Sequence, residues 1–163
     1  NGKSQKEVIT EDGKYPIIGS SGKPIGYAKE YLCEANSTII GRKGTINNPI
    51  LIENNYWNVD TAFGLHSKDG LHYKFLFYFC KSFDFTKLDK GSGRPSLVKS
   101  DLLKIKMPVP KTIEQKEIVE TLDNLNNNVK AIISVYKKEL INLEELKKSI
   151  LEKAFKGELT SAA

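Results

Sequence analysis

The sequence is poor in the residues that build metal and redox centres. Its 163 residues include two cysteines, two histidines, one methionine and one tryptophan. Cys33 and Cys80 form no CxxC pair and have no histidine cluster beside them, so we expect buried free thiols in a reducing compartment rather than a zinc site. His66 and His72 lie six residues apart without a carboxylate at metal-ligand spacing, which favours structural or surface roles.

Long hydrophobic runs are also missing. No apolar stretch approaches the roughly 20 residues that cross a bilayer, and the opening "NGKSQKEVIT" has no signal-peptide core. Hydrophobic residues make up 39% and charged residues 28% of the chain, a balance that is typical of folded proteins and not of disordered ones. We therefore expect a folded cytoplasmic protein without a membrane segment.

Catalytic motifs are absent as well. Neither Ser20 nor Ser96 lies in a GxSxG nucleophile elbow, and "KGSGRPSL" lacks the GxxxxGK[ST] phosphate loop. We find no S-adenosylmethionine motif, no methyltransferase tetrapeptide and no nuclease cluster of acids with lysine. Asp60 in "WNVDTAF" has no second carboxylate beside it, so we interpret it as structural. These absences favour a protein that binds without catalysing.

Positive charge is present, and it is unevenly placed. Residues 1–110 hold 16 Lys and Arg against 11 Asp and Glu, whereas residues 111–163 hold nine of each. The whole net charge of +5 therefore lies in the first two thirds. This asymmetry is typical of a domain that meets a polyanion, joined to a neutral segment that meets something else.

The chain divides near "MPVP" at residues 107–110. Before it, short β-like runs alternate with turns, and "HYKFLFYFCKSFDF" predicts a buried helix. The apolar residues of that helix recur at helical spacing: Tyr73, Leu76, Phe77, Cys80 and Phe83. We expect residues 1–110 to form an α+β domain with a mixed or strongly bent sheet.

After the prolines, the pattern predicts one long helix within residues 111–157, followed by a tail at residues 158–163. Thr112 and Gln115 resemble a capping box, no proline or glycine interrupts residues 113–155, and Gly157 is placed to end the helix. A break at the asparagine-rich "NLNNNVK" stays open. The apolar residues recur mainly in steps of four and three, with one four–four step at Leu140, which is a coiled-coil seam that requires a partner helix. The seam residues are Leu122, Leu125, Val129, Ile132, Tyr136, Leu140, Leu143 and, after a step at Leu146 or Lys147, Ile150.

Three loops combine glycine with basic and polar residues. Lys and Arg suit phosphates, while Asn, Ser, Thr and Arg can address base edges, so the loops predict a surface that binds duplex DNA. A solvated basic turn is the alternative for each loop, including "GRKG" at residues 41–44. The candidate DNA-binding residues are Ser20, Ser21, Lys23 and Tyr27 in the first loop; Arg42, Lys43, Thr45, Asn47 and Asn48 in the second; and Lys90, Ser92 and Arg94 in the third.

The order of these motifs is similar to a known family. "YPIIGSSGKPIGY", "IIGRKGTINNPILI", "YWNVDTAFGL", "GSGRPSLVKSDLLKIKMPVP", "TIEQKEIVETLDNLN" and "LKKSILEKAFKGELT" together resemble the DNA-specificity subunit of Type I restriction–modification systems. The resemblance implies a target recognition domain followed by a conserved spacer helix, which is half of a full subunit. It also implies that "GRKG" is a landmark at a turn of the recognition domain. We assign Trp57 and Asp60 to supporting structure, while the resemblance leaves a DNA-side role for Trp57 open.

The resemblance implies the partners too. DNA adenine methyltransferase subunits and a restriction and translocase subunit would assemble on the chain, and S-adenosylmethionine, ATP and magnesium would belong to those partners rather than to this chain. Two half-subunits would pair through the long helix as a homodimer, so that the complex reads a bipartite DNA site.

Two other interpretations stay open on the sequence alone. The chain would fit the recognition part of a fused restriction–methylation enzyme that is separated from its catalytic domains. It would also fit a coiled-coil assembly protein whose basic domain binds no DNA.

Overall fold

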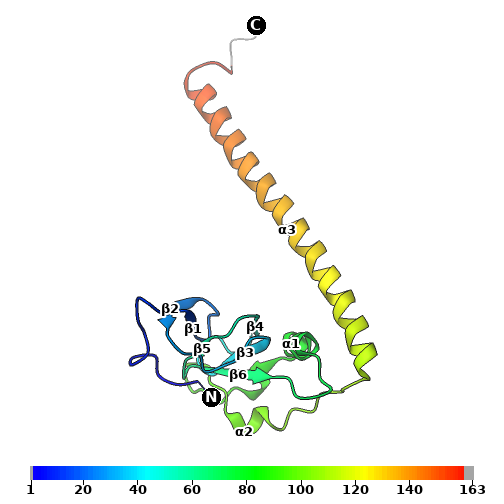
Figure 1. Cartoon of the computed structure of the whole chain (residues 1–163). Helices are drawn as coiled ribbons and strands as arrows, with labels where there is room; N and C mark the ends of the chain where they lie inside the picture. Colours follow the sequence, from blue (N-terminus) through cyan, green and yellow to red (C-terminus); the bar gives the residue numbers. More distant parts are fainter. Residues whose placement is uncertain (1, 160–163) are drawn as a thin grey trace. The chain divides into compact units, whose positions relative to one another are not determined.

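A computed structural model describes residues 2–159 of the chain (Figure 1). The last four residues of the expected tail, 160–163, lie outside this range. Two compact units are present, one ending at Val119 and the other beginning at Glu120. The elements in chain order are β1 (Tyr15–Ile18), β2 (Pro24–Ala28), β3 (Ser37–Gly41), β4 (Ile50–Ile52), β5 (Trp57–Asn58), β6 (Ala62–His66), α1 (Tyr73–Ser82), the 3-10 helix η1 (Phe85–Leu88), α2 (Lys99–Leu102) and α3 (Thr112–Phe155).

The strands form two small sheets. In the first, with strand order β2-β1-β5, β1 is antiparallel to β2 and parallel to β5. In the second, with order β4-β3-β6, β3 is antiparallel to both neighbours. The α+β class and the long helix are confirmed, with the expected bent sheet present as two separate sheets, one of them mixed.

β3 is buried on both of its faces. Ile39 and Ile40 are both fully buried, and neighbouring residues of a strand point to opposite faces. Ile39 packs with Ile18 of the first sheet, so it belongs to the cluster between the two sheets. Ile40 packs with Leu76 and Cys80 of α1. The burial of each isoleucine contributes about 1.5–3 kcal/mol, which fixes β3 between the first sheet and α1.

The predicted buried helix is α1. Its first turn is capped by His72, whose Nδ1 accepts a hydrogen bond from the Lys74 backbone N–H at 3.3 Å. Cys80 is 2% exposed, and burial raises the pKa of its thiol to about 12. Cys33 is half-buried, and both cysteines are free thiols. The structural role expected for His72 is thus a helix cap.

The capping box expected at Thr112 and Gln115 is wrong by one residue. Glu114 Oε2 accepts a hydrogen bond from the Lys111 backbone N–H at 3.0 Å, so Lys111 and Glu114 form this bond of the box. Gln115 turns the other way and is fully buried.

The Gln115 amide instead ties three backbone segments together. Its Oε1 accepts from the His72 N–H at 2.8 Å, and its Nε2 donates to the Gly70 and Pro110 carbonyl oxygens, both at 2.8 Å. One side chain therefore joins the start of α3 to the segment that leads into α1. Removal of the amide would break these three hydrogen bonds, all of which are at least partly shielded from water.

α3 is a single helix of 44 residues, roughly 65 Å long, and it runs unbroken through the asparagine-rich stretch. Gly157 ends it with φ +76°, as expected from the sequence. The Gly157 N–H donates to the Ala154 carbonyl at 3.1 Å and the Glu158 N–H to the Lys153 carbonyl at 2.9 Å, which is a Schellman motif. None of the described helices has the length and apolarity of a membrane span.

The apolar seam of α3 is largely exposed. Seven of its eight predicted residues expose 44–62% of their surface, whereas Leu122 is half-buried. These seven are Leu125, Val129, Ile132, Tyr136, Leu140, Leu143 and Ile150. Such a row of exposed apolar side chains is typical of an interaction surface.

Gln115→Met tests the three hydrogen bonds of the Gln115 side-chain amide. Methionine has nearly the same volume, so the substitution removes the three hydrogen bonds while creating little cavity. We expect the free energy of unfolding to fall by about 2–4 kcal/mol, measured by urea denaturation. Lys116→Ala, at the exposed neighbouring position, is the control and should leave the midpoint unchanged. Equal midpoints for both variants would contradict the role of Gln115.

Candidate nucleic-acid interface

The three candidate loops leave the sheets at defined places. The first loop, residues 19–23, joins β1 to β2; the second loop, residues 42–49, joins β3 to β4; and the third loop, residues 89–98, joins η1 to α2. The Gly22 N–H donates to the Gly19 carbonyl at 3.0 Å and closes the first loop into a turn. The remaining question is whether the fold brings these loops together.

Backbone hydrogen bonds join the second and third loops. Lys43 and Ser96 form an antiparallel β-bridge, flanked by bonds from the Gly44 N–H to the Pro95 carbonyl at 2.8 Å and from the Leu97 N–H to the Arg42 carbonyl at 2.9 Å. On the other side, the Arg42 N–H donates to the Thr61 carbonyl at 2.8 Å. "GRKG" is therefore not a free turn, because its backbone is paired on two sides.

The two glycines of "GRKG" permit close approach of the neighbouring loops. A Cβ on Gly41 would collide with the Thr45 carbonyl and would stand 3.1 Å from the Cβ of Ser20 in the first loop. Gly44 has φ +82°, and a Cβ there would stand 3.1 Å from Nη2 of Arg94. The Arg94 guanidinium thus lies against Gly44. All three loops meet around this stretch.

Arg42 and Lys43 line different pockets. Successive residues of an extended segment point to opposite sides, which separates these two neighbours. The Arg42 pocket has a volume of about 280 Å³ and the Lys43 pocket about 380 Å³. The Arg42 pocket is lined by Arg42, Phe63, Ser96, Leu97, Val98 and Lys99; the Lys43 pocket is lined by Lys43, Lys90, Gly91, Ser92, Gly93, Arg94 and Ser96.

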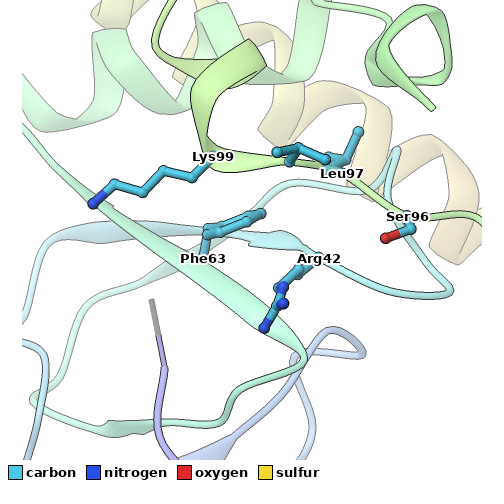
Figure 2. Close-up of a pocket in the computed structure, with 6 residues that line it drawn as sticks. Arg42, Phe63, Ser96, Leu97 and Lys99 are labelled. Carbon is cyan, nitrogen blue, oxygen red and sulfur yellow. The ribbon is translucent and has the colours of Figure 1, made fainter. Parts of the chain in front are cut away.

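The Arg42 pocket combines charge with an aromatic surface. Figure 2 shows the Phe63 ring between the side chains of Arg42 and Lys99. Arg42 Nη1 also donates to the Asp60 carbonyl oxygen at 3.2 Å, so part of its guanidinium is used within the domain. Sequence reasoning missed Lys99, whose signal was its place five residues after Arg94 in the same basic stretch.

The Lys43 pocket gathers three cations. Lys43, Lys90 and Arg94 are all exposed, and none of them forms an ion pair with another described residue. Arg presents a planar fork of donors and Lys a compact charge, which together suit the oxygens of a phosphate group. Gly93, next to Ser92, has no heavy atom within 4 Å of where a Cβ would stand, so the backbone there is open to a close ligand, whereas Gly91 lies against the Arg94 carbonyl.

A carboxylate holds the third loop. Asp89 Oδ1 accepts hydrogen bonds from the Gly91 and Ser96 N–H groups, both at 2.8 Å. The bonds from Ser96 and Gly91 hold the pKa of the Asp89 carboxyl below its usual range, so the group is charged at neutral pH. Sequence reasoning missed Asp89, because an acid in a basic loop has no local signal for this role.

Asn47 and Asn48 have different surroundings. Asn47 Oδ1 accepts from the Phe85 N–H at 2.9 Å and its Nδ2 donates to Asp84 at 3.3 Å, so its amide ties the second loop to η1. Asn48 is exposed, as is Thr45. The second loop therefore offers Thr45 and Asn48 to a ligand more readily than Asn47.

The other candidates are distributed between the first loop and β2. Ser20 lies beside Gly41, while Ser21 and Lys23 are exposed in the same loop. Tyr27 is exposed near the opposite end of β2, where its carbonyl accepts from the Thr10 N–H at 2.9 Å. The fold thus gathers the loops but leaves Tyr27 outside the contacts that join them.

Trp57 belongs to a core cluster around β1, whereas Asp60 contacts Arg42 of the second loop. Trp57 is 9% exposed, and its Nε1 donates to the Lys3 carbonyl at 3.4 Å. Asp60 contributes through its backbone carbonyl, which receives Arg42, whereas its carboxylate is exposed. Among residues 2–159, no group of three His, Cys, Asp or Glu side chains has an arrangement that could hold a metal ion.

Comparisons with known proteins relate the chain to one family. The family model for the Type I restriction modification DNA specificity domain matches residues 1–143. A Haemophilus influenzae protein named for the specificity subunit of a type I restriction enzyme is 25% identical over 131 residues, which cover 76% of this chain and 33% of that protein.

Solved structures show the same fold. A chain from a structure on complex assembly and conformational transition of the type I R-M system has a TM-score of 0.82 at 21% identity, and covers 96% of this chain and 43% of its own. The HsdS subunit of Thermoanaerobacter tengcongensis has a TM-score of 0.71 at 20% identity, over 97% and 42% of the two chains. The S subunit from M. genitalium has a TM-score of 0.64 at 24% identity, over 82% and 37%.

The chain thus spans between 33% and 43% of the lengths of these relatives. The match of the family model covers the two sheets, the three loops and most of α3. The resemblance seen in the order of the sequence motifs is confirmed, and the chain belongs to the Type I restriction modification DNA specificity domain family.

Proposed function

We propose that the chain is the DNA-recognition part of a Type I restriction–modification specificity subunit and has no catalytic activity of its own. The observation that carries this function is the meeting of three polar, basic loops on one surface of a chain from this family. Lys43, Lys90 and Arg94 are free to meet phosphates there, because no described carboxylate pairs with them.

The loop residues divide between backbone contacts and base contacts. Lys43, Lys90 and Arg94 lie around one pocket and are assigned to phosphates. Other polar groups of the three loops are assigned to base edges, since phosphate contacts carry no sequence information. These groups are Ser20, Ser21, Lys23, Thr45, Asn48 and Ser92, whereas Asn47 is assigned to holding the second loop.

The chain has the parts of one half of a two-domain subunit. Its residues 1–110 would form one target recognition domain and residues 111–157 one spacer helix. The exposed seam of α3 would pair with the same seam of a second copy, because water is a poor environment for a long apolar row. The homodimer would present two recognition surfaces to a bipartite site.

The remaining partners supply the chemistry. A DNA adenine methyltransferase subunit and a restriction and translocase subunit would assemble with this dimer. S-adenosylmethionine, ATP and magnesium would be bound by those subunits. This chain would determine where they act.

Selection from a randomised duplex pool at low salt, followed by sequencing of the bound fraction, tests the function. We expect enrichment of a short motif repeated in inverted orientation at a fixed spacing. A single unrepeated motif would retain sequence reading but contradict the two-fold dimer. If no motif is enriched with the chain alone or with its methyltransferase subunit added, sequence-specific recognition is wrong.

Lys43→Ala separates phosphate binding from folding. We expect weaker DNA binding, by about three- to tenfold, and a decrease of about 0.9 in the dependence of log K on log salt, because one phosphate contact is lost. Arg42→Ala should also weaken binding and additionally lower the unfolding midpoint, since it breaks the bond to Asp60. Titrations at several salt concentrations and thermal unfolding measure both effects.

Lys68→Ala is the matched control. It removes the same charge from the loop that follows β6. β6 ends beside Ser37, at the start of β3, whereas the second loop follows Gly41, at the other end of β3, so Lys68 and Lys43 lie at opposite ends of this strand. An equal loss of affinity in Lys68→Ala and Lys43→Ala would show a general charge effect and contradict the assigned contact.

Leu140→Glu tests the homodimer. A carboxylate in the seam would be desolvated on pairing, so we expect the dimer dissociation constant to rise at least about tenfold. Ser134→Glu adds the same charge two residues after Ile132, on the side of α3 away from the seam, and should leave the dimer intact. Sedimentation velocity over a concentration series measures both, and a wild-type chain that stays monomeric throughout would contradict the pairing.

A further inference from the structure

We propose that Asp89 is a positioning residue that shapes the Lys43 pocket for a phosphodiester group of DNA. The inference rests on the proposed function, since it assigns a role within the same DNA-binding surface. It concerns a residue whose charge is opposite in sign to its neighbours in the third loop.

The Asp89 carboxylate holds together the two ends of the segment 91–96, which is here called the neck of the third loop. Asp89 Oδ1 accepts hydrogen bonds from the backbone N–H groups of Gly91 and Ser96, each at 2.8 Å. A further bond, from the Lys90 N–H to the Ser96 carbonyl at 2.9 Å, lies beside them. The segment that carries Ser92 and Arg94 is therefore hydrogen-bonded to Asp89 at both of its ends.

This neck is also the place where the loop meets "GRKG". Ser96, which donates to Asp89, forms the β-bridge with Lys43. Lys43 and Lys90 are thus held on two backbone segments that share Ser96 as a partner. Arg94, between the pinned ends, lies against Gly44. The carboxylate consequently fixes where Lys90 and Arg94 stand relative to Lys43.

Electrostatics and geometry make opposite contributions at this residue. A carboxylate near a phosphate site repels the ligand, so its removal should strengthen DNA binding if charge alone mattered. Asp89 is exposed, and its charge is used to accept backbone N–H bonds rather than to pair with a cation. If the positioning effect exceeds the repulsion, removal of the side chain weakens binding even though the chain becomes more positive.

Asp89→Ala and Asp89→Asn have equal net charge and form the central comparison. The asparagine Oδ1 still accepts the two N–H bonds, whereas alanine accepts none. We expect Asp89→Ala to lower the affinity for a selected duplex about tenfold and to reduce the salt dependence, because the phosphate contacts of Lys90 and Arg94 are misplaced. Asp89→Asn should stay within about twofold of the wild-type chain.

Asp101→Asn is the charge control. Asp101 lies in α2, three residues beyond the end of the third loop. It is close enough to Lys90 to be influenced by its charge, but it pairs with Lys104 at 3.0 Å. Its removal should leave affinity unchanged or raise it. A matching loss in Asp101→Asn and Asp89→Ala would overturn the positioning role.

A double-mutant cycle distinguishes positioning from a general loss of structure. In a chain that already carries Lys90→Ala and Arg94→Ala, the Asp89→Ala substitution should not weaken binding further, because the two cations that it positions are gone. A full additional loss in that background would overturn the proposal, as would Asp89→Ala binding as tightly as Asp89→Asn. A wild-type chain that shows no salt-dependent DNA binding would refute the proposed function itself.

Discussion

The burial of β3 on both faces is the constraint on which the recognition surface depends. Because Ile39 packs toward the first sheet and Ile40 toward α1, the strand has no freedom to shift or to turn over. Its end at Gly41 is therefore fixed, and "GRKG" begins there. The third loop is built onto this fixed edge by the Lys43–Ser96 bridge. Core packing thus determines where the basic side chains are displayed, although none of them belongs to the core.

The three cations of the Lys43 pocket repel one another, and no described group neutralises them. Bringing Lys43, Lys90 and Arg94 around one pocket places like charges together, and no ion pair with a described residue offsets their repulsion. The nearby carboxylate of Asp89 is engaged with backbone N–H groups. The repulsion stays small in water and is relieved when a polyanion replaces the counterions. Structure and charge therefore favour the same type of ligand.

The sequence predicted features that depend on local periodicity or on a single residue type. The helical spacing around Leu76 and Cys80 marked α1, and Gly157 marked the end of α3 because a left-handed residue is needed there. Features that depend on distant partners were not predictable. The sequence predicted a capping box at Gln115, because its spacing from Thr112 is a local signal. Its actual partners, Gly70 and His72, lie more than 40 residues away, where a local pattern gives no signal. The meeting of the second and third loops likewise depends on backbone bonds between residues about 50 positions apart, which local patterns do not encode.

The seam of α3 differs from the core of the recognition domain in how it gains stability. Residues such as Ile40 are buried by their own chain, so their contribution to folding does not depend on concentration. Leu140 and Ile132 expose 61% and 54% of their surfaces, so the single chain gains little stability from them, and in the proposed dimer they would stabilise only the assembled molecule. No residue of the three loops belongs to the seam, so the loops and the seam are separate parts of the chain.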